Sequence, residues 1–351
     1  MVNGGFFMKK TVIGVIGAGN VGRVHIENIM TAIPQANLKH VSDPYPEKYN
    51  EWAKELGYPE AITDYTIMLK DAEVEAVVIC APAAVHGDLI MEAARAGKHV
   101  FCEKPFDYSI DKIVEAMKVV EECGIKLQLG FNRRFDHNFA KARDYVDAGK
   151  VGDVHVIKIT SRDPIPPAMG YFTAPGGENC SIYTDTTIHD FDMARFLNNC
   201  EVTEVYAMGS KLINKDKPEI TRDDTCVITL RFEDNSLAVI DNSWEAVYGY
   251  DQRAEVFGTK GAVTIENDVF SQATLNAREG IVGEKPLVSI KDRYGAAYAE
   301  EIRQFILSVQ NNAPVKATGM DGLMSIVIAK AARKSAEENR PVKVSELMPK
   351  L

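Results

Sequence analysis

The sequence has no excess of positive charge. Its 351 residues contain 40 Lys and Arg against 50 Asp and Glu, for a formal net charge of −10. Such a chain repels nucleic acid and anionic lipid overall, so we expect neither as a partner, and any anion that it binds must be held by local geometry. It also lacks an apolar run approaching the roughly 18–20 residues of a membrane helix. With 46% hydrophobic and 26% charged residues, the composition is typical of a soluble globular protein.

Cysteine is sparse and follows no ligand pattern. The six Cys residues include no Cys-x-x-Cys pair or other zinc spacing, so we expect no metal site and no disulfide. Residues 1–8 have no cationic segment, and their apolar stretch is too short for a secretory signal, so we interpret them as an extension. These features predict a cytoplasmic protein with reduced thiols.

The length suggests two domains at about 150 residues each. Over residues 1–130, short β-branched runs alternate with helical stretches. This alternation predicts an α/β domain with a doubly wound parallel sheet. Its strands are expected at 12–16, 38–41, 76–80, 99–101 and 126–129.

The pattern changes after about Val151, where strand-like segments follow one another directly. We expect an α+β domain over residues 131–351, with a largely antiparallel sheet and with C-terminal helices that could pack back on the first domain. The strands are expected at 154–160, 202–210, 226–232, 237–244 and 255–265, and the helices at about 186–197, 297–310 and 322–338.

A glycine motif, Gly17-Ala-Gly19-Asn-Val-Gly22, lies between the first apolar strand and a helical stretch. The string alone is a weak signal, but a preceding strand and a following helix are the context that it needs. The first two glycines allow a tight turn and a close approach of the backbone to a pyrophosphate, and Gly22 lets the helix pack on the strand. The unpaired N–H groups of the helix start attract phosphate. This motif predicts a Rossmann domain that binds a dinucleotide.

Asp43 ends the second expected strand, 21 residues after Gly22. A carboxylate there accepts hydrogen bonds from the ribose hydroxyls of NAD and repels the 2′-phosphate of NADP, so we predict NAD. The alternative is that Asp43 only caps the turn before Pro44.

Lys104 follows the expected strand 99–101 in the segment Glu103-Lys104-Pro105. Ligands of open parallel sheets bind outside the carboxyl ends of the strands, where an ammonium could stabilise a developing alkoxide. The alternative for this residue alone is a solvated lysine beside a turn.

Asp185, His189 and Asp192 have helical spacing. On one helix they would lie within about 60° of each other, since four residues turn about 400° and seven about 700°. A histidine flanked by carboxylates on such a face suits the role of a general base, because the carboxylates stabilise its protonated ring. The alternative is a core histidine with satisfied hydrogen bonds.

Four motifs in chain order carry a family resemblance: residues 17–25, Glu103-Lys104-Pro105, residues 130–135 and residues 185–190. Together they resemble the glucose-fructose oxidoreductase/inositol dehydrogenase/rhizopine catabolism (Gfo/Idh/MocA) family over about residues 9–340. Within it, segments 161–167, 187–196 and 248–253 are similar to inositol 2-dehydrogenases.

The resemblance implies a Rossmann domain followed by an α+β domain with a large open-faced sheet, assembled as a homotetramer. It implies a catalytic group of Lys104, Asp185 and His189. The NAD-binding residues that it implies are Gly17, Gly19, Asn20, Val21, Gly22, Asp43, Ala81, His86, Glu103 and Lys104. The substrate-binding residues that it implies are Asn132, Arg133, Asp163, Thr186, Tyr248 and Tyr294.

Residues and resemblance together predict NAD-dependent oxidation of a secondary hydroxyl of a cyclic polyol, with myo- or scyllo-inositol giving the keto-inositol. Four alternatives stay open: a hexose dehydrogenase, a keto-inositol reductase, an enzyme that cleaves glycosides through a transient ketone, and a non-enzymatic NAD(P)-responsive regulator. The last is disfavoured because the chain retains Lys104 and His189.

Overall fold

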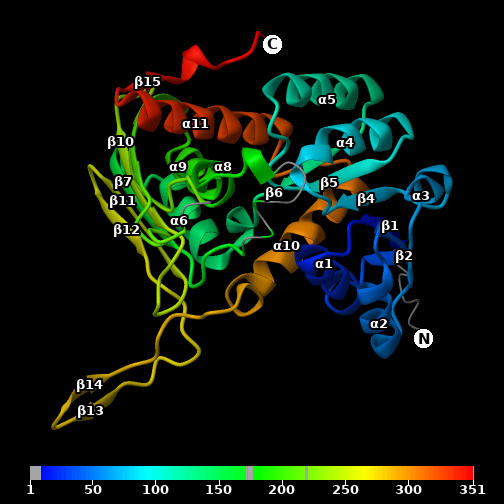
Figure 1. Ribbon diagram of the computed structural model, residues 1–351, viewed down its shortest axis with the longest axis horizontal. Coiled ribbons are helices and arrows are strands. Elements are labelled where there is room, and N and C mark those ends of the chain that lie inside the picture. The colour runs from blue at the N-terminus through cyan, green and yellow to red at the C-terminus, as the bar shows by residue number, and fades with distance from the viewer. Residues whose placement is uncertain (1–8, 169, 171, 173–176, 218–219, 351) are drawn as a thin grey trace, which may run out of the picture. The chain divides into compact units, whose positions relative to one another are not determined.

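The computed structural model describes residues 9–168, 170, 172, 177–217 and 220–350 (Figure 1). The extension expected over residues 1–8 lies outside this part of the chain. Contacts divide the chain into two compact units, Met1–Asn132 with Ala296–Gly322 and Arg133–Gly295 with Leu323–Leu351. The chain therefore leaves the first unit after Asn132 and returns to it for one later segment.

The first unit contains a six-stranded, fully parallel sheet in the order β3-β2-β1-β4-β5-β6. This order confirms the predicted doubly wound sheet. Five of its strands lie where the apolar runs predict them, whereas β3 is too short to leave a pattern. The strands are β1 (Thr11–Ile16), β2 (Ala36–Ser42), β3 (Ala61–Ile62), β4 (Ala76–Ile79), β5 (His99–Glu103) and β6 (Leu127–Gly130).

The crossover helices of this unit end where the sequence provides helix stops. Gly57 and Gly124 end α2 and α5 in left-handed conformation, with φ of 68° and 64°. The helices are α1 (Asn20–Thr31), α2 (Glu47–Leu56), α3 (Thr66–Lys70), α4 (His86–Arg95) and α5 (Ile110–Cys123), joined by most of α10 (Ile290–Gln310) and by the start of α11 (Gly319–Glu338). Ile26 of α1 and Ile302 and Phe305 of α10 share one core cluster with Phe101 of β5. Helices α1 and α10 therefore contribute to the same core.

The second unit is built on a seven-stranded sheet in the order β12-β11-β7-β10-β9-β8-β15. Only β7 and β10 pair in parallel, so the mostly antiparallel prediction is confirmed. Helix α9 packs on β7 and on α6, which covers the same side of the sheet in Figure 1. The strands are β7 (Val154–Arg162), β8 (Val202–Ser210), β9 (Thr225–Phe232), β10 (Leu237–Ser243), β11 (Asp251–Gly258), β12 (Gly261–Ile265) and β15 (Val342–Lys343). The helices of this unit are η2 (Asn132–Phe135, which begins one residue before the boundary), α6 (His137–Asp147), η3 (Gly177–Asn179), α8 (Ile182–Asp185), α9 (Ile188–Asn198), η4 (Val344–Glu346) and most of α11.

Two expected elements of this unit are each divided in the structure. The single strand expected at 255–265 is a hairpin of β11 and β12, in which Gly258 pairs with Gly261 across a tight turn. The helix expected at about 186–197 begins only at Ile188, and Asp185 ends the separate short helix α8. The second division changes the geometry of the candidate site.

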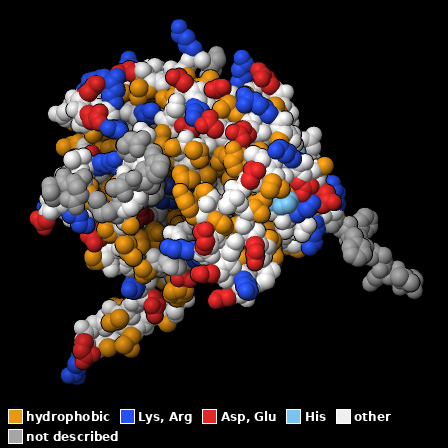
Figure 2. Space-filling view, turned by 45° about the vertical axis from the view of Figure 1, so that its right-hand side comes forward, with side chains coloured by type: hydrophobic (Ala, Val, Ile, Leu, Met, Phe, Trp, Pro, Cys, Tyr) orange, Lys and Arg blue, Asp and Glu red, His pale blue; other side chains and the backbone are white. Residues whose placement is uncertain are grey.

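A small hairpin of β13 (Leu275–Ala277) and β14 (Gly280–Val282) extends from the second unit and was not expected. Its apolar side chains are exposed, as the orange side chains along it at the lower left of Figure 2 show. No helix within the described ranges is long and apolar enough to cross a membrane. All six cysteines are free thiols.

Candidate active site

The glycine loop after β1 has the shape that a pyrophosphate requires. Gly17 has φ of 96°, and a Cβ atom there would lie 2.6 Å from the carbonyl carbon of Cys80. A Cβ at Gly22 would lie 2.1 Å from the carbonyl oxygen of Gly17. A Cβ at Gly19 would meet no atom within 4 Å among the described residues, so this side of the loop is open. The loop therefore packs tightly inward and leaves room outward for a ligand.

The start of α1 supplies the donors of this loop. Gly19 is the N-cap, Asn20 and Val21 form the first turn, and no described side chain caps the helix. The N–H groups of that turn are available to an anion. Open space beside Gly19 and uncapped donors together fit the pyrophosphate of a dinucleotide.

Asp43 caps the turn after β2, which is one of the two roles considered for it. Its Oδ2 accepts the N–H of Ala18 at 2.8 Å, and its Oδ1 accepts the N–H of Tyr45 at 2.9 Å. The carboxylate thus ties the glycine loop to the end of β2 and also caps the following turn. Each carboxylate oxygen has a second lone pair, which leaves capacity for ribose hydroxyls.

His86 links the segments that follow β4 and β5. Its Nε2 lies 2.7 Å from the carbonyl oxygen of Ala81, and its Nδ1 lies 2.8 Å from that of Pro105. Burial lowers the pKa of His86, which favours the neutral ring. His86 therefore holds together the loops beside Ala81 and Lys104.

Glu103 and Lys104 lie at the carboxyl end of β5. The backbone N–H of Lys104 donates to Oε2 of Glu103 at 3.2 Å, and Oε1 of Glu103 lies 2.6 Å from Nε2 of His25. A Cβ at Gly130, the last residue of β6, would lie 2.9 Å from Oε2 of Glu103. Glu103 is buried, whereas the side chain of Lys104 is half-buried.

In the second unit, Asp185 and His189 lie on either side of a helix break. Ser181 caps α8, and the N–H of Thr187 donates to the carbonyl of Ile182, five residues earlier. Asp185 therefore ends α8, and His189 lies in the first turn of α9. Both side chains are half-buried.

The expected row of carboxylate, imidazole and carboxylate on one helix is wrong. Asp192 is fully buried, and its two oxygens accept Nε and Nη2 of Arg134 at 2.8 and 2.6 Å. This ion pair stabilises the packing of α9 and holds the Asp192 carboxylate apart from the expected row.

Thr186 and Asp163 are brought together beside this break. Oγ1 of Thr186 donates to Oδ2 of Asp163 at 3.3 Å and accepts Nε1 of Trp244 at 2.9 Å. The backbone N–H of Asp163 donates to Ser243 at the end of β10. The α8–α9 junction and the ends of β7 and β10 therefore meet at fully buried Trp244.

Arg133 and Tyr294 belong to one buried network. Arg133 donates from Nη1 to Oδ1 of Asp190 at 2.5 Å and from Nη2 to Oγ of Ser161 at 2.9 Å. Gln252 joins the two, since its Oε1 accepts Ser161 at 3.3 Å and the Tyr294 hydroxyl at 3.2 Å. Burial raises the pKa of Asp190, although Arg133 opposes that shift.

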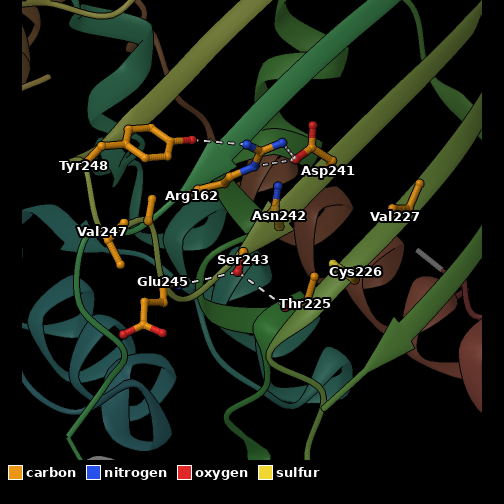
Figure 3. Close-up of a pocket in the computed structure, with 11 residues that line it drawn as sticks. Arg162, Thr225, Cys226, Val227, Asp241, Asn242, Ser243, Glu245, Val247 and Tyr248 are labelled. Carbon is orange, nitrogen blue, oxygen red and sulfur yellow. Dashed lines mark hydrogen bonds and ion pairs between the residues drawn. The ribbon is translucent and has the colours of Figure 1, made fainter. Parts of the chain in front are cut away.

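Tyr248 lies elsewhere in this unit. Its hydroxyl donates to Oδ2 of Asp251 at 2.7 Å and accepts Nη1 of Arg162 at 3.1 Å. Figure 3 shows this hydroxyl directed toward Arg162, which also pairs with Asp241. Tyr248, Arg162 and Asp241 line a cavity of about 380 Å³ with Val227, on the exposed side of the sheet. The structure therefore does not bring Tyr248 to the Arg133–Tyr294 network.

Comparison with known proteins gives the family. Residues 11–131 match the model of an oxidoreductase family with an NAD-binding Rossmann fold, and residues 139–264 match a GFO/IDH/MocA C-terminal domain. An oxidoreductase of Bacillus subtilis strain 168, YrbE, is 44% identical over 96% of this chain and 97% of its own. The chain belongs to the Gfo/Idh/MocA family. Its cofactor is NAD, and it is an oxidoreductase.

Two further Gfo/Idh/MocA relatives carry substrate names. The myo-inositol 2-dehydrogenase of Thermotoga maritima is 41% identical over 96% of this chain and 99% of its own. The crystal structure of scyllo-inositol dehydrogenase from Lactobacillus casei, with bound NAD(H) and scyllo-inositol, superimposes with a TM-score of 0.87. It is 31% identical, and the match covers 96% of this chain and 100% of that one.

Several residues that organise this Gfo/Idh/MocA site were not predicted as site residues. Trp244, Asp190 and Gln252 position predicted residues through contacts between distant segments. Asp190 directly follows His189 in a recognised motif, which is a signal that could have drawn attention to it. Gln252 likewise lies in segment 248–253, which carries part of the family resemblance, whereas Trp244 lies outside the motifs named above.

Gly19→Ala tests the cofactor loop. Its backbone φ of −69° suits alanine, so we expect an unchanged melting temperature. The added Cβ would occupy the open side of the loop, so the Kd for NAD should rise about tenfold or more, measured by calorimetric titration. Gly283→Ala is the control, since a Cβ there would make only an ordinary contact with Oγ1 of Thr274 at 3.9 Å, and it should leave the Kd unchanged. Unchanged NAD binding in Gly19→Ala would place the pyrophosphate elsewhere.

Proposed function

We propose that this Gfo/Idh/MocA protein is an NAD-dependent inositol 2-dehydrogenase, which oxidises one secondary hydroxyl of myo- or scyllo-inositol to the keto-inositol. The observation that carries the proposal is the likeness over nearly the full chain to relatives named for this activity, at 41% and 38% identity. The likeness includes both the NAD-binding unit and the unit that holds Asp185 and His189.

The proposed catalytic group is Lys104, Asp185 and His189. Bound NAD accepts a hydride from the carbon that is oxidised. His189 takes the hydroxyl proton, Asp185 stabilises the charged imidazole, and the ammonium of Lys104 holds the oxygen as negative charge develops on it. The hydride leaves the carbon and the proton leaves the hydroxyl oxygen bound to it, so the oxidation needs a hydride acceptor and a base held at the same carbinol group.

The polar groups that we propose as substrate contacts suit a polyol. Oδ1 of Asn132 is buried with no hydrogen-bond partner among the described residues, so it is available to accept a substrate hydroxyl. Asp163 and Thr186 are already joined to each other, which fixes their orientation for further hydroxyl contacts. Arg133 and Tyr294 complete the proposed pocket, and the network through Ser161 and Gln252 holds them rigid.

We also propose a homotetramer that works in the cytoplasm. One side of the large sheet exposes apolar side chains on four strands, namely Met208, Val227, Leu237 and Phe257. Such a surface suits contact with other copies, and Tyr248 lies on the same side. Six free thiols suit a reducing compartment. Light scattering tests the assembly and should give four times the mass of one chain. Cell fractionation tests the location and should recover the protein in the cytoplasmic fraction.

Steady-state oxidation of a substrate panel tests the function. With NAD, we expect kcat/KM for myo- or scyllo-inositol to exceed that for D-chiro-inositol and glucose by about tenfold or more, and NADP to be a poorer cofactor because of Asp43. Preference for glucose would identify a sugar dehydrogenase. Turnover only in the direction from keto-inositol to inositol would identify a reductase. Cleavage of a glycoside with NAD retained on the enzyme would contradict the proposed net oxidation. NAD binding without any turnover would identify a regulator.

A further inference from the structure

A buried cluster of titratable groups lies beneath the glycine loop and is not used by the proposed mechanism. His25 of α1, Glu103 of β5 and Glu301 of α10 lie in the same unit. His25 and Glu301 have no exposed surface, and Glu103 is 8% exposed. Nε2 of His25 lies 2.6 Å from Oε1 of Glu103 and 3.9 Å from Oε1 of Glu301.

Glu301 is the unusual member of this cluster. Neither of its oxygens has a hydrogen-bond partner among the described residues. Nε2 of His25 can donate only one proton, and its short contact to Glu103 uses it. An ionised carboxylate that is fully buried without a donor is costly, whereas a protonated one is not. Burial and the neighbouring Glu103 both raise the pKa of Glu301 well above its usual range.

Within the described part of the chain, the other titratable groups recorded beside Glu301 carry no positive charge. The thiols of Cys80 on the β4 side and Cys102 on β5 are buried, and burial raises their pKa, so they remain neutral. Tyr298 packs its ring on His25, and Gln128 of β6 donates to the backbone carbonyl of Glu301. Among the described residues, His25 is the only basic group within 4.0 Å of the Glu301 carboxylate.

The same three side chains could be mistaken for a metal site, since their ligand atoms all lie within 4.8 Å of one another. The contact of 2.6 Å between His25 and Glu103 is a hydrogen bond. Two ligands of one tetrahedral zinc, each about 2.0–2.2 Å from the ion, would lie roughly 3.3 Å apart. The geometry therefore favours a proton in the cluster over a metal ion.

The cluster lies close to both parts of the cofactor site. His25 is five residues after Asn20, or roughly 8 Å along α1 from the N–H groups that face the pyrophosphate. Cys80 packs against the loop, since a Cβ at Gly17 or Gly22 would lie 2.6 or 3.5 Å from its atoms, and the charges of Glu103 and Glu301 both act on its thiol. Glu103 also binds the backbone N–H of Lys104. A charge on the cluster therefore acts on the bound dinucleotide.

We propose that Glu301 is a neutral carboxylic acid which, together with the His25–Glu103 pair, links the binding of the dinucleotide to the binding of a proton. The pyrophosphate brings negative charge to a cluster that has one cation at most. Charges about 10 Å apart in a medium of effective dielectric near 20 change a binding constant roughly tenfold. By reciprocity, NADH binds more tightly to the form in which Glu301 is protonated.

Fluorescence titration with NADH from about pH 6 to about pH 9 tests this proposal without turnover. We expect the wild-type Kd to rise roughly tenfold as the pH increases, and the Kd of Glu301→Gln to stay nearly constant. Glu300→Gln changes the preceding, half-exposed glutamate and should behave like the wild type. The same pH dependence in wild type and Glu301→Gln would overturn the proposal.

Thermal unfolding gives a second readout with a defined sign. A carboxyl whose pKa is raised by folding holds a proton that the unfolded chain has lost, so wild-type stability falls as the pH rises above 4.5. Glu301→Gln has no such group. Its melting temperature relative to the wild type should therefore increase with pH, and a constant difference would contradict a neutral Glu301.

The wild type alone also tests the proposal, should Glu301→Gln not fold. NADH titration by calorimetry in buffers of different ionisation enthalpy counts the protons that are taken up. A net uptake is expected, and no uptake at any pH would overturn the linkage. One tightly held divalent metal per chain, found by elemental analysis, would also overturn it. The inference rests on NAD binding and not on the polyol, so an unexpected substrate would leave it intact.

Discussion

His189→Ala should lower kcat for inositol oxidation by about a hundredfold to ten-thousandfold, the usual contribution of a positioned general base. The substitution leaves the NAD-binding unit untouched, so the Kd for NAD should stay within about twofold. His189 is half-buried in the first turn of α9, and the removal of its ring does not break the Asp192–Arg134 pair that anchors this helix. Single-turnover absorbance of NADH measures the chemical step.

The dependence of kcat/KM on pH distinguishes a general base at His189 from a residue that only contributes to packing. In the wild type, kcat/KM should fall on the acidic side as the base becomes protonated, and His189→Ala should lose that limb. His137→Ala, at a histidine whose side chain is 68% exposed, is the matched control and should keep normal turnover. Near-normal turnover of His189→Ala would remove His189 as the base.

The first unit could be predicted well because its signals are local. Five of its six strands are short segments of four to seven residues, and the glycine loop needs only six consecutive positions. Asp43 was assigned two alternative roles from the sequence, and the structure shows that one carboxylate performs the capping role while retaining lone pairs for a ligand. Only β3, with two residues, left no pattern.

The second unit was harder to predict because its site depends on contacts between distant segments. Residues 182–198 have nearly continuous helical spacing, and the break appears only in backbone bonding, where Thr187 reaches back to Ile182. The spacing of Asp192 from His189 predicts a site residue, whereas its side chain pairs with Arg134, 58 positions earlier in the chain. The segment Ala296–Gly322 returns to the first unit and places Glu301 beside His25, 276 positions away. No local sequence pattern predicts this contact.

The candidate site combines a rigid frame with a few adaptable contacts. Buried polar pairs such as Arg133–Asp190 and Trp244–Thr186 hold the frame, and each is costly to break because the remaining partner would be left unsatisfied. Asp185, His189 and Lys104 are half-buried by contrast, which leaves them accessible to a substrate. Family motifs therefore identify the accessible groups better than the frame that orients them.

Lys104→Met should lower kcat and kcat/KM for inositol equally, by about a hundredfold to a thousandfold. Methionine keeps the length of the side chain and the backbone bond to Glu103 but removes the ammonium, so an interaction that strengthens as negative charge develops on oxygen is lost. Lys118→Met, at an exposed lysine of α5 in the same unit, is the control and should leave kinetics unchanged.

The double variant Lys104→Met/His189→Ala tests whether the two residues act on one carbon. Groups that act as a unit give strongly non-additive losses, so the double variant should be only slightly slower than the slower single variant. Losses that multiply fully would mean that Lys104 and His189 work independently. A rise in KM at constant kcat for Lys104→Met would limit the lysine to substrate binding, because such a loss is shared by the ground state and the transition state.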